Sequence, residues 1–179
     1  NCTADLRPEY LYAWDFFMQQ IALQNCCLTV LNLIKEVIYL RQISGNKLLV
    51  KALKEEGVTT LFGYPGACTI DISDELYRQS GIDIILPRHE QALVHEADAY
   101  ARTTGKVGVC LVTSGPGATN LVTGLATANY DSVPLVCFTG QVARHLIGND
   151  AFQEVDIVGI TRSITKYGVT VRNLSLIHI

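Results

Sequence analysis

Residues 107–120 carry the sequence that decides the fold, VGVCLVTSGPGATN. The first six residues are glycine or apolar residues, as in a strand that is buried on both faces of a parallel sheet. The turn Ser114-Gly115-Pro116-Gly117 follows, and a helical pattern begins at Ala118. Because a buried strand, a tight turn and a helix in this order make up the first part of a βαβ unit, the stretch predicts an α/β domain.

The same alternation of strand and helix continues on both sides of this stretch. Apolar runs predict strands at residues 58–62, 82–86, 107–112 and 133–139, and a last strand within 163–171. Apolar residues at helical spacing predict helices at residues 44–56, 70–80, 90–104, 118–129 and 156–160. We therefore expect a doubly wound, mainly parallel sheet with helices on both faces.

Parallel sheets of this kind bind ligands outside the carboxyl ends of their strands. Four segments follow predicted strands directly and are expected to line one site. They are residues 63–69, 88–90, 114–117 and 140–154.

Residues 1–42 differ in composition from the rest of the chain. They contain none of the 14 glycines and no pattern that indicates chemistry. We expect an extension here, and two interpretations stay open: a segment that is not native to the protein, or a helical segment that packs on the domain or on a partner.

Charge and cysteine content exclude several classes of function. The chain has 14 basic and 17 acidic residues and no cluster of Lys and Arg, so we expect no binding to nucleic acid or to an anionic membrane surface. The longest apolar stretch, residues 21–34, is too short to span a membrane. The six cysteines lack the spacing of metal ligands, so no metal site is expected, and free thiols indicate a reducing compartment, the cytoplasm.

The turn after residue 113 superficially matches a dinucleotide-binding motif. Asn120 stands in place of the third glycine, and no acidic residue follows at a strand end about 20 residues on. A phosphate-binding P-loop is also excluded, because no Lys-Ser or Lys-Thr pair follows at the required spacing. What remains is a turn with small side chains that lets a flat ligand approach the backbone closely.

Glu90 is the most informative titratable residue. An acidic residue in the first turn of a helix usually interacts only with the helix dipole and solvent. Glu90, however, directly follows an apolar strand, within the polar sequence Arg88-His89-Glu90-Gln91. Its carboxyl group is therefore expected at the ligand-binding edge of the sheet.

Four motifs occur in the order and spacing of one enzyme family. They are Phe62-Gly63-Tyr64-Pro65-Gly66, Arg88-His89-Glu90-Gln91, residues 112–120, and Asp150-Ala151-Phe152-Gln153-Glu154. With these motifs, residues 42–173 resemble the N-terminal pyrimidine-binding domain of thiamine diphosphate enzymes, and most closely that of the acetolactate synthases. The pair Gln141-Val142 and the sequence Ala-Phe-Gln-Glu look specific to the acetolactate synthases.

The resemblance implies roles for individual residues. Glu90 would hydrogen-bond the pyrimidine ring nitrogen of thiamine diphosphate and favour the tautomer whose exocyclic nitrogen removes the thiazolium proton. Phe152 and Gln153 would line the substrate side, where Gln153 donates to a developing oxyanion, and packing in the core is the alternative role for Phe152. The other residues expected against the cofactor are Tyr64, Pro65, Gly66, Gly115, Pro116 and Gly117.

The activity that the resemblance implies is the condensation of decarboxylated pyruvate with a second 2-keto acid, pyruvate or 2-ketobutyrate, in branched-chain amino acid biosynthesis. Mg²⁺ and FAD would be bound by other domains of the full-length enzyme. The site would lie between subunits, so a homodimer or higher homo-oligomer is expected, and a regulatory small subunit is left open. The chain alone would supply half of a site and is expected to be inactive.

Alternatives remain at this stage. Glyoxylate carboligase, sulfoacetaldehyde acetyltransferase and pyruvate oxidase share Glu90 and the Ser-Gly-Pro-Gly turn, and a non-catalytic nucleotide-binding or interaction module is the alternative outside the enzymes. The sequence also departs from the family at Ala67, where a glycine is usual and where a positive φ would strain alanine. Residues 174–179 do not resemble the family's continuation, so the domain at 43–173 is expected to be incomplete and the chain a fragment.

Overall fold

Four parallel strands form the centre of residues 43–172, the part of the chain that the structure, a computed structural model, describes. The strands are β1 (Thr60–Gly63), β2 (Asp83–Ile85), β3 (Gly108–Val112) and β4 (Leu135–Thr139). Their order in the sheet is β2-β1-β3-β4, and every neighbouring pair is parallel. The predicted doubly wound α/β fold is confirmed.

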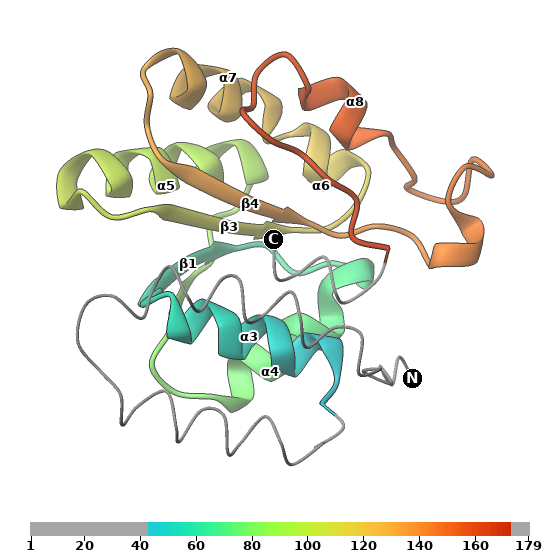
Figure 1. The fold of residues 1–179 in the computed structure, drawn as a ribbon, viewed down its shortest axis with the longest axis horizontal. Helices are drawn as coiled ribbons and strands as arrows, with labels where there is room; N and C mark the ends of the chain where they lie inside the picture. The colour runs from blue at the N-terminus through green and yellow to red at the C-terminus, as the bar shows by residue number, and fades with distance from the viewer. Residues whose placement is uncertain (1–42, 173–179) are drawn as a thin grey trace, which may run out of the picture.

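Helices cover both faces of this sheet (Figure 1). Helices α3 (Gly45–Glu55) and α4 (Ile70–Arg78) lie on one side, and α5 (Glu90–Thr104) and α7 (Val122–Tyr130) lie on the other. Four further elements are short: η2 (Ala67–Thr69), α6 (Pro116–Thr119), η3 (Arg144–Leu146) and α8 (Ile157–Thr161).

The strands divide their side chains between two cores because successive residues of a strand point to opposite faces. Leu61 of β1 joins a cluster with α3 and α4, whereas its neighbour Phe62 joins a cluster with α5. The first cluster contains Val50, Leu53, Leu61, Leu76, Ile82, Val109 and Leu111. The second contains Phe62, Leu93, Val94, Ala97, Cys110, Val112 and Leu121.

Local signals position both ends of α5. His89 is the N-cap residue, and its Nδ1 accepts a hydrogen bond from the backbone N–H of Gln91 at 3.1 Å. Gly105 adopts the left-handed conformation with φ 71° and ends the helix. The cap makes Glu90 the first residue of α5, at the carboxyl-end side of the sheet, as the sequence predicts.

Two predictions of secondary structure need correction. Residues 163–171 form no strand in the described chain, because this segment has no strand beside it with which to pair, and Val171 is 50% exposed. The helix predicted at 118–129 is divided into α6 and α7.

The two outer strands are also less buried than the apolar sequences predict. All three residues of β2 are exposed, and β4 is only half-buried along most of its length. Each of these strands has a neighbour on one side only within the described residues, so one edge stays open.

Residues 1–42 and 173–179 lie outside the described residues, and so do the predictions for the N-terminal extension and the C-terminal tail. Within residues 43–172, no helix has the length and apolar character that are needed to cross a membrane.

Candidate functional site

The strand order places a topological switch point between β1 and β3. The chain leaves β1 toward α4 on one face of the sheet and leaves β3 toward α7 on the opposite face. The two loops therefore diverge at the carboxyl ends of neighbouring strands, where open parallel sheets bind ligands. Tyr64, at the start of the first loop, donates its backbone N–H to the carbonyl of Leu111 on β3 at 2.9 Å.

The first loop packs tightly on the second at Gly66. A Cβ atom at this position would lie 2.4 Å from Cβ of Thr113, so only glycine fits. The hydroxyl of Thr69 stabilises the same turn, because it accepts from Gly66 N at 3.3 Å and donates to Gly66 O at 3.2 Å. Ala67 is exposed, lies in η2 and has no positive φ, so the methyl group that departs from the family is tolerated without strain.

The turn after β3 is formed by two glycines that are required for different reasons. Gly115 has φ 55° and ψ −114°, and a Cβ atom there would lie 2.6 Å from the carbonyl oxygen of Gln153. At Gly117 a Cβ atom would lie 2.7 Å from Cγ2 of Thr113 and 3.4 Å from Oε1 of Glu90. Only glycine at position 117 therefore lets this turn pack on Thr113 so close to the Glu90 carboxylate.

The Glu90 side chain is held beside this turn by a residue for which the sequence indicated no role. The side-chain amide of Asn120 donates to Oε2 of Glu90 at 2.9 Å, and the pair is partly buried. Asn120 lies where the chain breaks between α6 and α7, so the division of the predicted helix turns its side chain toward α5. The only indication in the sequence that Asn120 belongs to the site was its place in the motif at residues 112–120. Its contact with Glu90, 30 residues away in the chain, depends on the fold.

Thr113 contributes a buried hydroxyl to the same place. The residue is 8% exposed, and its Oγ1 has no hydrogen-bond partner in the described part of the chain. Buried hydroxyls are normally paired, so an unpaired one beside two glycines and a carboxylate is suited to a polar ligand. A flat ring with donors and acceptors, such as the aminopyrimidine of thiamine diphosphate, fits this set of groups.

The segment at residues 140–154 extends beyond the carboxyl end of β4 and returns to the turn at Gly115 (Figure 1). The main chain of Gln153, with φ 59°, is the part that packs against Gly115. Phe152 is 87% exposed, so its alternative role in the core is wrong for the described chain. Gln141 connects the two ends of this segment, because its Oε1 accepts from Val142 N at 2.8 Å and its Nε2 donates to Val155 O at 3.4 Å.

The four segments predicted to line one site do meet. Cys68 of the first segment lies against the turn after β3, with its Sγ 3.2 Å from Oγ of Ser114. It also lies against the last segment, because a Cβ atom at Gly140 would lie 2.8 Å from Cβ of Cys68. The sequence-predicted residues are distributed around this junction. Tyr64 packs on the second core, Pro65 and Pro116 are exposed, and Gly66, Gly115, Gly117, Glu90 and Gln153 lie at the contacts described above.

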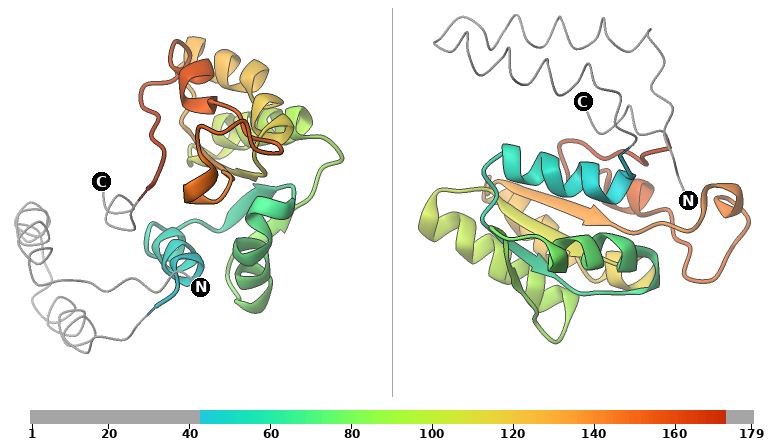
Figure 2. Two further views of the ribbon diagram at one scale, coloured as in Figure 1. Left: turned by 90° about the vertical axis from the view of Figure 1, so that its right-hand side faces the viewer. Right: turned by 90° about the horizontal axis from the view of Figure 1, so that it is seen from below.

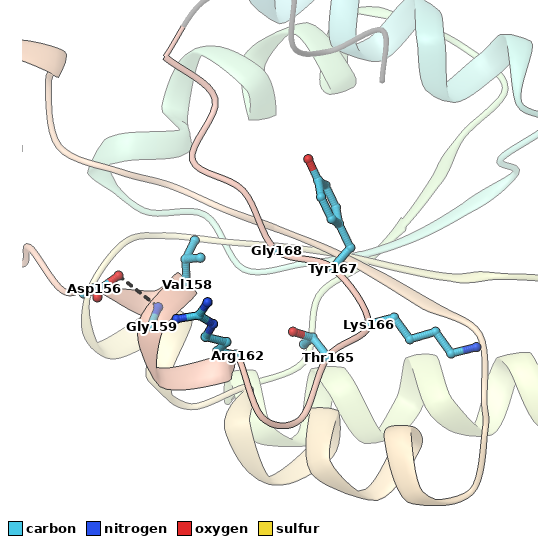
Figure 3. A pocket seen from close by; sticks show the side chains of 8 residues that line it. All are labelled: Asp156, Val158, Gly159, Arg162, Thr165, Lys166, Tyr167 and Gly168. Atoms are coloured by element: carbon cyan, nitrogen blue, oxygen red, sulfur yellow. Dashed lines mark hydrogen bonds between the residues drawn. The ribbon is translucent and has the colours of Figure 1, made fainter.

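A cavity of about 450 Å³ lies elsewhere, between α8 and the segment that follows it (Figure 3). Its polar side chains do not converge, because Lys166 and Tyr167 point away from Arg162. The carboxylate of Asp156 is already occupied by the backbone N–H of Gly159 at 2.9 Å. Ligand sites need a few converging polar groups, so the junction at Glu90 is the better candidate.

Known proteins similar to this chain are acetolactate synthases. The isozyme 3 large subunit of Escherichia coli is 56% identical over 133 residues, which are 74% of this chain and 23% of that protein. The large subunit of Haemophilus influenzae is 54% identical over 133 residues, with the same two shares. The chloroplastic acetolactate synthase of Arabidopsis thaliana is 56% identical over 130 residues, 73% of this chain and 19% of that protein. The chain thus spans less than a quarter of the length of these relatives.

A family model described as thiamine pyrophosphate enzyme, N-terminal TPP binding domain, matches residues 43–160. Thiamine pyrophosphate is another name for thiamine diphosphate. The matched residues include all four strands and most of the junction around Glu90. The chain therefore belongs to the thiamine pyrophosphate enzyme family and carries its N-terminal TPP binding domain.

Proposed function

We propose that this chain supplies the pyrimidine-binding half of the active site of an acetolactate synthase large subunit, an enzyme that condenses pyruvate with a second 2-keto acid. The observation that carries the proposal is the Glu90 carboxylate, held by Asn120 beside the glycine turn at Gly117. The similarity to acetolactate synthases at 54–56% identity supports this activity over that of other thiamine diphosphate enzymes.

The chain's own residues prepare the cofactor for reaction. When bound, thiamine diphosphate supplies a carbon nucleophile for attack on the keto group. Asn120 occupies Oε2 of Glu90, so Oε1 is the oxygen that remains to hold a proton shared with a ring nitrogen. Gly115 and Gly117 keep this turn free of side chains next to Glu90, and the unpaired Thr113 hydroxyl is the further polar group of the site.

Phe152 and Gln153 act on the substrate side in this proposal. Both belong to the segment that packs on Gly115, so they are close in sequence and space to the cofactor turn. The amide of Gln153 donates to the oxygen that becomes negative when the keto carbon is attacked. The exposed ring of Phe152 becomes covered when the second half of the site closes over it.

Further partners complete the proposed enzyme. We propose that two copies of the large subunit form the site between them, in a homodimer or higher oligomer, and that Mg²⁺ and FAD bind outside residues 43–172. No group of three or more His, Cys, Asp or Glu side chains in the described chain is arranged to hold a metal ion. The cytoplasm is the proposed compartment, supported by free thiols at Cys68, Cys110 and Cys137.

Cofactor binding can be tested on the 179-residue chain by titration with thiamine diphosphate, followed by the backbone amide signals in NMR. We expect the signals of Thr113, Gly115 and Gly117 to shift, and the shifts to disappear in Glu90→Gln. The control is Glu96→Gln, which makes the same charge change on an exposed part of α5. Equal responses from the native chain and Glu90→Gln would contradict the role of Glu90.

The activity can be tested in a chimeric enzyme. Residues 43–160 of this chain replace the matching segment of the E. coli isozyme 3 large subunit, and formation of acetolactate from pyruvate is measured. We expect activity from the chimera and its loss in the chimera with Glu90→Gln. A folded chimera that binds thiamine diphosphate but makes no acetolactate would contradict the proposed activity and favour another function for the domain.

A further inference from the structure

The loop at residues 148–153 has an unusual backbone. Gly148, Asp150 and Gln153 all have positive φ, at 86°, 51° and 59°. Two of these residues are not glycine, and such conformations persist only when neighbouring groups hold them in place. The structure therefore has to contain a group that stabilises this loop.

Glu154 is that group. One oxygen of its carboxylate accepts from the backbone N–H of Gly148, and the other accepts from Ala151 N at 2.9 Å. Its own backbone N–H donates to Ala151 O at 2.9 Å. Glu154 therefore contacts the start of the loop at Gly148 and its middle at Ala151. The hydrogen bonds from Gly148, Ala151 and Asn149 lower the pKa of Glu154 because they stabilise the ionised carboxylate, and burial opposes this effect.

The opposite side of the loop lies on the turn that the cofactor is expected to contact. A Cβ atom on Gly115 would lie only 2.6 Å from the carbonyl oxygen of Gln153. The main chain of Gln153 therefore packs directly on Gly115. Gln153 thus lies between Gly115 on one side and the residue that closes the loop, Glu154, on the other.

We propose that Glu154 is a positioning residue: its carboxylate closes the loop at residues 148–153 and so holds Gln153 against the turn at Gly115. The proposal rests on the proposed function, in which Gln153 acts on the substrate. It gives this loop a support of its own, because Phe152 is exposed and belongs to neither core. Glu154 stands in the motif at residues 150–154, and the sequence alone indicated no role for it.

The first test compares backbone amides in the full chain with the variant Glu154→Gln. A neutral amide oxygen accepts weaker hydrogen bonds than a carboxylate does. We expect the amide signals of Gly148 and Ala151 to lose their downfield shift and hydrogen exchange to rise at least tenfold in residues 148–153. The signal of Gly115 should also move, which a purely local effect within the loop would not produce.

The matched control is Glu55→Gln, at the exposed end of α3 and remote from the loop. It removes the same charge and should change none of these signals. Unchanged exchange and an unchanged Gly115 signal in Glu154→Gln would overturn the proposal, and so would equal effects of both variants. Because neither readout needs turnover, these outcomes do not depend on the activity of the chimera.

The second test separates the two proposals. In the active chimera, Glu154→Gln should lower kcat/KM for pyruvate roughly tenfold to a hundredfold, the scale expected for a displaced catalytic group, while thiamine diphosphate affinity changes little. A loosened loop with unchanged kinetics would overturn the positioning role and leave the acetolactate synthase proposal intact. An inactive chimera with the expected changes at Gly115 would contradict only the proposed activity.

Discussion

Two polar side chains meet at the junction of the loops, Glu90 of α5 and Asn120 between α6 and α7. Glu90 was found from the sequence because a carboxylate directly after an apolar strand has few other places to lie. Its partner Asn120 was not found, because their contact at 2.9 Å depends on how α6 and α7 divide. A motif thus indicates which residues matter, whereas the fold shows which atoms they present to one another.

The contact between Asn120 and Glu90 leads to a prediction. Asn120→Asp replaces a donor by a second carboxylate and repels Glu90 by about 1–4 kcal/mol at 4 Å. We expect thiamine diphosphate affinity of the chain to fall roughly tenfold to a hundredfold, measured by the NMR titration. Asn129→Asp, at the exposed end of α7, is the matched control, and an equal loss there would contradict a specific role for Asn120.

Glu154 predicts a dependence of stability on pH. Its ordinary pKa of 4.5 applies to the unfolded chain, and the folded pKa is lower. The unfolded state therefore binds more protons between these two values, so the stabilisation is complete above pH 4.5 and is lost as the pH falls through the folded pKa. The free energy of unfolding of native chain and Glu154→Gln should differ at pH 7 and converge in acid.

Other charged groups in the same segment are Arg144, His145, Asp150 and Asp156. Asp156 is engaged at the start of α8 with Gly159 N, and the other three are in or before the loop. These groups are the same in both proteins, so the difference between native chain and variant isolates Glu154. A difference that stays constant from pH 7 to acid would contradict the lowered pKa.

At the scale of elements, the turn between β1 and α4 depends on Gly66 and not on the position that departs from the family. A methyl group at Gly66 would lie 2.4 Å from Thr113 Cβ, whereas Ala67 is exposed. We expect Gly66→Ala to lower the free energy of unfolding by about 1–3 kcal/mol, measured with urea. The neighbouring change Ala67→Gly should cost less than about 1 kcal/mol, and the opposite ranking would show that the turn is positioned differently.

Elements also show where pattern analysis succeeded. The helix at 90–104 was predicted with its bounds because the helical spacing of its apolar residues and the glycine at 105 are local signals, and the structure adds the cap at His89. The prediction of a last strand within 163–171 was wrong. Alternating apolar residues allow a segment to form a strand, but they do not supply a neighbouring strand for it to pair with. Backbone hydrogen bonds of a strand belong to two segments, and only one of them is in the local sequence.

At the scale of the whole molecule, stability comes from two cores on opposite faces of the sheet. Leu93 is fully buried in the core that α5 forms with the sheet. Leu93→Ala should lower the free energy of unfolding by about 2–5 kcal/mol, because the cavity it leaves is only partly refilled. Tyr77→Ala, at a side chain 86% exposed, should change it by less than about 0.5 kcal/mol, and equal effects would contradict the described core.

The arrangement of the site also belongs to this scale. Residues from four segments, far apart in the chain, meet because parallel strands bring every strand-to-helix turn to one edge (Figure 2). Figure 2 shows helices on both sides of the strands, so the two faces of the sheet are covered. The order β2-β1-β3-β4 then selects the turns after β1 and β3 as the centre of the site.

The sequence by itself determined the fold class, most helix bounds, the four turns and the place of Glu90 directly after a strand, because periodicity and small turn residues act over a few positions. Only the tertiary structure decided the partnership of Glu90 with Asn120, the unpaired hydroxyl of Thr113, the contact of Gln153 with Gly115 and the hydrogen bonds of Glu154. The physical reason is that these are contacts between side chains and backbone atoms of separate loops. Their geometry follows from the order of the strands and from where the connecting helices begin and end, and no local pattern specifies it.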